Sequence, residues 1–301
     1  MPTETCDLHA HSTASDGLTP PSELASIAQT AGLGAFALTD HDTTAGVADA
    51  RAAAERLGIG FLPGIELSAN PFSILERHEH AHWGTLHVLG YGIDEADTSL
   101  QAVCDELANA RNERNPEIVD RLNSLGVKIS YEQVVASASA TGSNVVGRPH
   151  IAAVLQERGY VRSHHEAFRR YIGEGAPAYV RKDALSAGRA IETIRAAGGV
   201  AVLAHPIQLT RDRDLLGRAL IRLRELGLQG VEVIHPDQKA GTRQGLAHHA
   251  RRLGLLMTGG SDFHGKEHGA KLGAMRVPLN YHKTLSAKIE YLSRASQDRK
   301  S

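Results

Sequence analysis

The sequence predicts an α/β fold, a TIM-like barrel of strand–helix units with an inserted small helical domain. Two observations predict it. Short apolar runs alternate with amphipathic stretches near both ends of the 301-residue chain, which is typical of repeated strand–helix units. Residues 98–177 break this alternation and show only helical patterns. Apolar residues make up 42% of the chain, enough for a sizeable core.

The elements follow in order from the apolar runs. The first run leads into His9, and the later expected strands lie within 35–42, 58–66, 85–93, 199–206, 230–236 and 254–264. Amphipathic stretches between them predict helices; "TPPSEL" starts one, with Thr19 or Ser22 as cap and prolines just inside. We therefore predict a first barrel part over 1–97, a helical insertion or cap over 98–177, and a second barrel part over 178–301.

Composition excludes several classes of function. A formal net charge of -1 argues against a broad electrostatic grip on duplex nucleic acid, and 4% aromatic residues argue against base-stacking platforms. Cys6 and Cys104 are the only cysteines, which excludes a disulfide framework and a Cys-rich zinc motif. The sequence has no signal-like segment and no apolar run of spanning length, so we expect a cytoplasmic protein with no membrane and no stable protein partner.

Each expected strand ends in, or is followed by, side chains that bind metals. These are His9, His11, Asp16, Asp40, His41, Glu66, His87, His205, His235, Asp262 and His264. The carboxyl ends of barrel strands converge on one rim, where active sites are built. Residues His9 and His11 lie at i and i+2 of a strand and face the same way. A mixed imidazole and carboxylate set suits Mn, Fe or Zn, so we predict a centre of two or three divalent ions.

The same motifs carry a family resemblance. In order, His-X-His, "TDHDT", "GIE", "HVLGYGID", "AVLAHP" and "GSDFHG" resemble the PHP (polymerase and histidinol phosphatase) family. "GRPHIA" and "AYV" in and after the insertion resemble the bacterial subgroup of nucleoside 3',5'-bisphosphate phosphatases and 5'-3' exoribonucleases.

The resemblance implies a distorted (β/α)7 barrel with up to three divalent ions. The ligands it implies are His9, His11, Asp16, His41, Glu66, His87, His205, Asp262 and His264. We favour His87 over His82 of the "RHEHAHW" segment because His87 lies in the "LHVLGYGI" strand pattern. The resemblance gives Asp40 a supporting role in catalysis, in which it orients a ligand imidazole.

The expected reaction is phosphoester hydrolysis by a metal-bridging hydroxide that attacks phosphorus while the ribose oxygen leaves. His235 is the candidate general acid or phosphate contact. Arg148 is the best candidate for phosphate binding, with His150 and Lys182 as further substrate contacts. The expected substrate is a nucleoside 3',5'-bisphosphate that loses its 3'-phosphate, and 5'-to-3' trimming of short oligoribonucleotides uses the same chemistry.

Three alternatives stay open at this stage. The first is another phosphatase of the family, of the histidinol-phosphate type. The second is a metal-dependent amide hydrolase, because His-X-His barrels also perform that chemistry. The third is a non-catalytic PHP module that binds nucleic acid or a polymerase; such modules tend to lose ligands, and this chain retains the full set.

Overall fold

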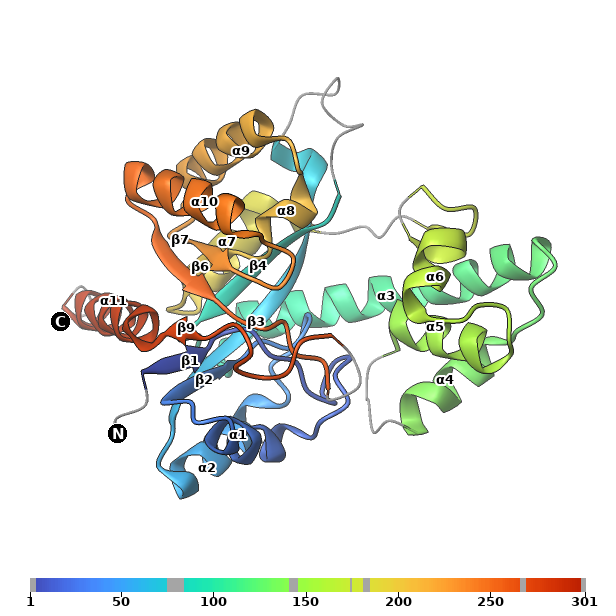
Figure 1. Ribbon diagram of the computed structural model, residues 1–301, viewed down its shortest axis with the longest axis horizontal. Coiled ribbons are helices and arrows are strands. Elements are labelled where there is room, and N and C mark those ends of the chain that lie inside the picture. The colour runs from blue at the N-terminus through green and yellow to red at the C-terminus, as the bar shows by residue number, and fades with distance from the viewer. Residues whose placement is uncertain are drawn as a thin grey trace.

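The computed structural model describes residues 4–74, 84–140, 146–173, 175–180, 185–265 and 269–298. A mixed β-sheet curls into a nearly closed barrel with helices around it, and a group of short helices stands to one side (Figure 1). The strands are β1 Thr5–Asp7, β2 Ala35–Leu38, β3 Gly60–Asn70, β4 Leu86–Tyr91, β5 Leu185–Ser186, β6 Val200–Leu203, β7 Gly230–Ile234, β8 Leu256–Gly259 and β9 Val277–Pro278. This is the expected α/β barrel with added helices.

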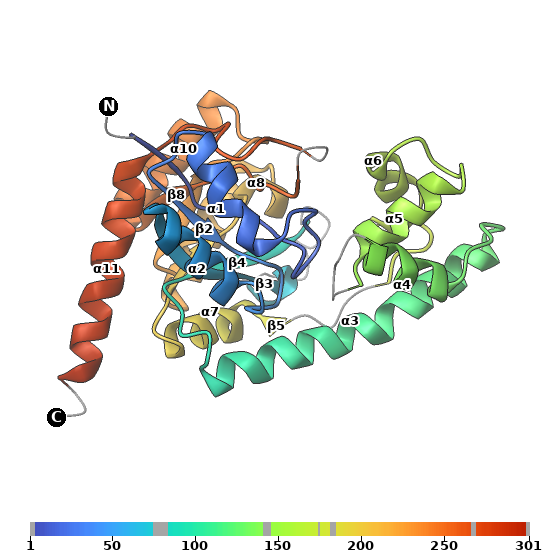
Figure 2. The same cartoon turned by 90° about the horizontal axis from the view of Figure 1, so that it is seen from below.

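The helices divide into those around the barrel and those beside it. Around the barrel lie α1 Pro21–Thr30, α2 Val47–Leu57, η1 Pro71–Ile74, α7 Ala187–Ala196, α8 Pro206–Leu209, α9 Arg213–Glu225, α10 Ala240–Leu253 and α11 Leu279–Gln297. The cap helices are α4 Tyr131–Ala140, α5 Arg148–Glu157, α6 His164–Ala167 and η3 Phe168–Ile172. A single long helix, α3 Thr98–Ser124, leads from the barrel to them (Figure 2).

The strand order is β8-β7-β6-β4-β3-β2-β1-β9, and the direction of one strand corrects the expectation of parallel strands. Strand β4 pairs antiparallel with both β3 and β6. Its first residues, rather than its last, therefore lie at the rim formed by the carboxyl ends of the neighbouring strands. This reversal is what brings His87, the second residue of β4, to that rim.

Backbone hydrogen bonds between the two ends of the chain close the barrel. The amide of Leu8, directly after β1, donates to the carbonyl of Gly259, the last residue of β8, at 3.1 Å. The next segments continue the pairing, since Phe263 donates to His9 at 3.3 Å and His11 donates to Phe263 at 2.8 Å. The first and last motifs of the sequence thus lie side by side.

Helix α3 belongs to two hydrophobic cores. Its first half contributes Leu100, Val103 and Leu107 to the core that also contains the buried face of α7. Its second half contributes Ile118 and Leu122 to a separate core formed with α4, α5 and η3. The division of the chain at residues 98 and 178 stays a prediction, and α3 physically joins both sides of the first boundary.

Among the described residues, no helix combines the length and the apolar character needed to cross a bilayer.

Candidate metal centre

Glu66 lies at the middle of the rim, fully buried, and imidazoles approach it from several elements. Its Oε1 lies 3.1 Å from His87 Nδ1 and 2.9 Å from His205 Nε2. The Oε2 atom lies 3.0 Å from His41 Nδ1. The same oxygen is 3.4 Å from His9 Nε2 and 3.3 Å from His11 Nε2. One carboxylate therefore gathers side chains from both halves of the chain.

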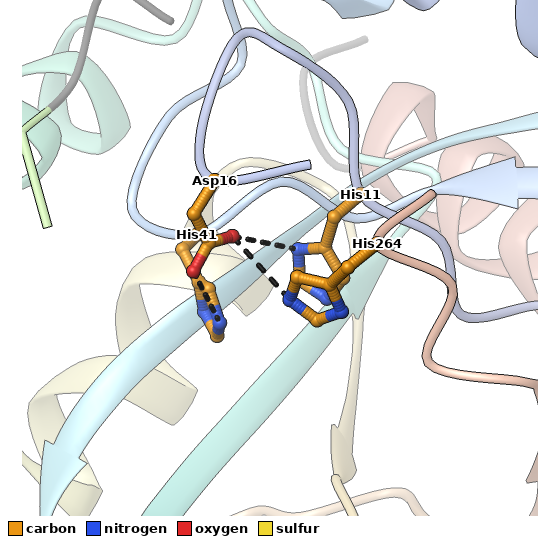
Figure 3. Close-up of side chains that lie close together, drawn as sticks. All are labelled: His11, Asp16, His41 and His264. Atoms are coloured by element: carbon orange, nitrogen blue, oxygen red, sulfur yellow. Dashed lines mark ion pairs between the residues drawn. The ribbon is translucent and has the colours of Figure 1, made fainter. Parts of the chain in front are cut away.

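Asp262 and Asp16 extend the cluster on either side of Glu66. Asp262 Oδ1 lies 3.3 Å from His9 Nε2 and 3.2 Å from His11 Nε2. One oxygen of Asp16 points to His11 and His264, at 3.9 Å and 3.4 Å, and the other lies 3.9 Å from His41 (Figure 3). The structure thus brings the nine side chains implied by the family resemblance into one connected cluster.

The cluster fits divalent cations because many imidazole nitrogens and carboxylate oxygens lie close together. Three groups of donors each lie within 4.8 Å of one another: His11, Asp16, His41 and His264; His9, His11 and Glu66; and His41, Glu66 and His87. Several buried nitrogen and oxygen atoms of the cluster make no hydrogen bond to the described residues. They are His9 Nε2, both ring nitrogens of His11, His41 Nδ1, Glu66 Oε2 and His205 Nδ1. Buried polar atoms normally have partners, so these atoms fit metal ions.

The electrostatics of the cluster favour positive charge. Burial alone lowers the pKa of His41, but Glu66 and Asp16 outweigh it and raise that pKa to about 9. Burial likewise opposes the effect of Asp16 and Asp262 on His264, whose pKa rises to about 10. Burial raises the pKa of Glu66, yet the surrounding imidazoles hold it well below its usual value. Carboxylates that stay ionised in a buried site require positive charge beside them, which either protonated imidazoles or metal ions can supply.

Glu232, which the sequence interpretation missed, holds two of these side chains in place. It lies fully buried in β7, and its Oε1 is 3.0 Å from His9 Nδ1. Its Oε2 accepts the backbone N–H of His205 at 2.7 Å. A proton on His9 Nδ1 that is donated to Glu232 leaves the Nε2 lone pair directed at the cluster. The signal in the sequence was a glutamate inside the apolar run "GVEVI".

Asp40 holds a loop, and its expected role in orienting a ligand imidazole stays a prediction. It is buried, and its oxygens accept the N–H and the hydroxyl of Ser12, both at 2.7 Å, and the hydroxyl of Ser15 at 2.6 Å. Its hydrogen bonds within the described chain therefore fix the turn between His11 and Asp16. A direct contact with an imidazole of the cluster is made by Glu232, to His9.

His235 lies beside the cluster, at the end of β7. Its Nε2 is 3.4 Å from Asp262 Oδ2, and its Nδ1 accepts the backbone N–H of Asp237 at 3.2 Å. The accepted bond places the proton of a neutral His235 on Nε2, which faces the cluster. This geometry suits proton donation, and the assignment as general acid stays a prediction.

The backbone around the cluster is strained. Asp42, His205 and Asp262 have positive φ angles of 56°, 23° and 51°, which are uncommon for residues other than glycine. Gly260 approaches His9 so closely that a Cβ at this position would lie 2.3 Å from His9 Cβ. Strain and close approach at one rim are typical of functional sites.

A pocket of about 420 Å³ connects this cluster with the cap. Asp16, His41 and His87 line one side of it, and Arg148 with residues of the cap lines the other. Arg148 begins α5, and its guanidinium stacks over the rings of Phe168 and Tyr179, 5.5 Å and 5.9 Å from their centroids.

The other predicted substrate contacts are His150 and Lys182, and their role stays a prediction. His150 is buried, and its Nδ1 accepts the N–H of Gly147 at 3.0 Å at the start of α5. This bond caps the helix. Lys182 and the alternative ligand His82 lie outside the described residues. Arg111 and Arg114 of α3 line the pocket and were missed, because their helix gave no sign of the face it presents.

Comparisons with known proteins agree with this architecture. A family model of the PHP domain matches residues 7–185. A 5'-3' exoribonuclease of Haemophilus influenzae is 34% identical and aligns with 87% of this chain and 90% of its own. A 3',5'-nucleoside bisphosphate phosphatase of Chromobacterium violaceum is 35% identical over 88% of this chain and 89% of its own. A phosphoribosyl 1,2-cyclic phosphate 1,2-diphosphodiesterase of Eggerthella lenta is 35% identical over 90% of this chain and 98% of its own.

A solved structure is similar over nearly the whole chain. It is an amidohydrolase from Chromobacterium violaceum with bound sulfate and no metal, 33% identical, with a TM-score of 0.81. The match covers 94% of this chain and 96% of the other. The likeness therefore includes the cap as well as the barrel.

Proposed function

Because the chain belongs to the PHP domain family and is a metal-dependent phosphoesterase, we propose that it removes the 3'-phosphate from nucleoside 3',5'-bisphosphates. Stepwise 5'-to-3' trimming of short oligoribonucleotides is proposed as a second activity of the same site. Both substrate classes place a phosphate on each side of one ribose, and similar proteins are named a 5'-3' exoribonuclease and a 3',5'-nucleoside bisphosphate phosphatase.

The observation that supports the proposal is a single pocket lined both by residues of the cluster and by an arginine of the cap. One wall contains Asp16, His41 and His87 of the cluster, and the other contains Arg148. A volume of about 420 Å³ lies within the range for small-ligand pockets. A substrate with one phosphate at each end of a nucleoside matches this arrangement better than a simple monophosphate does.

The proposed ligands are the nine clustered side chains, and the proposed metals are two or three ions of Mn, Fe or Zn. Bound divalent ions supply an acidified water as nucleophile and neutralise the charge of the phosphate. Glu232 keeps His9 oriented, and Asp40 keeps the turn that carries Asp16 in place. The proposed role of His235 is to deliver the Nε2 proton to the leaving ribose oxygen.

The test is a panel of phosphorylated compounds with added manganese, followed by release of inorganic phosphate. We expect the highest kcat/KM with adenosine 3',5'-bisphosphate, and adenosine 5'-monophosphate as the product. The panel includes histidinol phosphate, a phosphoribosyl cyclic phosphate and an amide substrate. Preference for any of these three over the bisphosphate would contradict the proposal and support the corresponding alternative. Absence of hydrolysis with every metal tested would favour a non-catalytic module.

A second test concerns the chain length of the substrate. Short oligoribonucleotides with a 5'-phosphate should lose mononucleotides from the 5' end, and the same oligonucleotides with a 5'-hydroxyl should be cleaved much more slowly. Release from the 3' end would contradict the proposed direction.

A further inference from the structure

Two arginines of α3 line the pocket beside Arg148, and their surroundings differ. Arg111 forms a buried ion pair with Asp42, so its charge is already balanced within the protein. Arg114 is only 9% exposed, and its NH2 donates to the neutral side-chain oxygen of Asn115 at 3.2 Å. Its Nε is buried and has no hydrogen-bond partner among the described residues.

Arg114 therefore has excess positive charge around it. Burial, Arg148 and Arg111 together lower its pKa to about 9. A buried charge without a partner is costly, and the cost falls when an anion enters the site. A guanidinium with an unused N–H is suited to phosphate, which it binds through a planar fork of donors.

We propose that Arg114, together with Arg148, binds the phosphate that is not cleaved and so selects substrates with two phosphate groups. Arg148 is held in place by Phe168 and Tyr179. Arg114 comes from the middle of α3, between the barrel core and the cap core. The inference deepens the proposed function and rests on it for the identity of the cleaved phosphate.

The experiment compares two substrates with the same scissile bond, using the metal-loaded full chain. Adenosine 3',5'-bisphosphate has the second phosphate, and adenosine 3'-monophosphate lacks it. Arg114→Gln should lower kcat/KM for the bisphosphate about 10- to 100-fold, the effect of one hydrogen bond to a charged group. The kcat/KM for the 3'-monophosphate should change by less than about threefold, because this substrate lacks the phosphate that Arg114 would bind. Arg114→Lys should recover part of the loss, since it keeps the charge but not the fork.

The matched control is Arg158→Gln, which removes the same charge from an exposed position at the end of α5. It should leave the ratio of the kcat/KM values for the two substrates unchanged. Equal losses on both substrates in Arg114→Gln and Arg114→Lys would overturn the inference, because they would indicate a structural role.

A binding measurement separates this inference from the proposed function. Calorimetric titration with adenosine 5'-monophosphate should show weaker binding to Arg114→Gln, by the same factor, while adenosine itself binds both proteins equally. If the wild-type protein binds the 5'-monophosphate through Arg114 but does not cleave 3'-phosphates, the proposed function fails and the phosphate site stands. If it cleaves them and Arg114→Gln leaves both the substrate ratio and the 5'-monophosphate affinity unchanged, the phosphate site fails and the function stands.

Discussion

At the scale of single residues, the rim contains side-chain atoms suited to metal binding and the groups that orient them. His9 is the clearest case, because its Nε2 faces Glu66 and Asp262 while its Nδ1 contacts Glu232. Outer partners of this kind fix the tautomer of a metal-binding imidazole and raise its basicity. The charge on Glu232 is therefore expected to matter for cation affinity as well as for shape.

Replacing Glu232 by glutamine tests this role. Gln keeps the size and the acceptor oxygen but loses the charge, so we expect metal affinity to fall about 10- to 100-fold. Titration against a competing chelator measures it. Glu225→Gln, at an exposed position ending α9, is the matched control and should change nothing. If Glu232→Gln binds metal with unaltered affinity, the charge of Glu232 does not contribute and the side chain acts only as a hydrogen-bond acceptor.

The two thiols should be unreactive in the folded protein. Cys6 and Cys104 are buried, and burial raises the pKa of each to about 12. Because the thiolate is the reactive form, a thiol reagent at pH 8 should modify neither residue until the protein is unfolded in urea. Mass spectrometry before and after unfolding measures this. Rapid labelling of either cysteine under native conditions would contradict the burial described.

Most of the clustered residues could be singled out because they follow apolar runs, a pattern visible in the sequence alone, whereas His87 lies inside its strand and was included through the family resemblance. Glu232 was not predicted, since its partner His9 lies 223 positions away in the sequence and meets it only when the barrel closes. Arg111 and Arg114 were not either. On an isolated helix such residues are indistinguishable from solvated surface charges, and only the docking of the cap turns them towards a pocket.

At the scale of elements, β4 and α3 place the most distant parts of the site. The direction of β4 is not encoded locally, because side chains alternate with a period of two whichever way a strand runs. Helix α3 crosses from one core to the other, and at 27 residues it is about 40 Å long. Its contacts with the barrel therefore set the position of the cap.

Within the described parts of the chain, two ion pairs link α3 to the barrel, and they should differ in strength. Arg111 pairs with Asp42, with both side chains buried, whereas Arg189 of α7 pairs with Glu106 at the exposed surface. Arg111→Met removes the cation beside the buried carboxylate of Asp42, which keeps its hydrogen bonds from Ser68, and should lower the free energy of unfolding by about 3–5 kcal/mol.

Arg189→Met is the matched control and should cost about 0–1 kcal/mol. Urea denaturation followed by circular dichroism measures both variants. A larger loss for the exposed pair would show that Arg111 does not anchor α3.

At the scale of the whole molecule, cation binding and folding are linked, because the ligands come from both parts of the barrel. In chelated protein, His41 and His264 have pKa values of about 9 and 10, above the ordinary 6.5. Their protonation therefore contributes stability that is complete below pH 6.5 and disappears as the pH rises through these values. Metal ions need neutral imidazoles and replace these protons.

The stabilisation by manganese should consequently increase with pH. Between about pH 6.5 and pH 9 the chelated protein loses stability while the affinity for metal rises. We expect the difference in Tm between loaded and chelated protein to widen over this range, as measured by thermal unfolding in parallel buffers. Phosphate release should stop on chelation and return with manganese. A difference that narrows as the pH rises would contradict this linkage.

The seam at which Leu8 meets Gly259 and His9 meets Phe263 has a consequence for biosynthesis. A ribosome delivers His9 and His11 early, but Asp262 and His264 emerge more than two hundred residues later. Contacts between residues so far apart in sequence form slowly, because the chain loses loop entropy before the stabilising contacts form. A chain that ends before Asp262 thus lacks part of the metal-binding cluster, and we expect hydrolytic activity only after this segment has been synthesised.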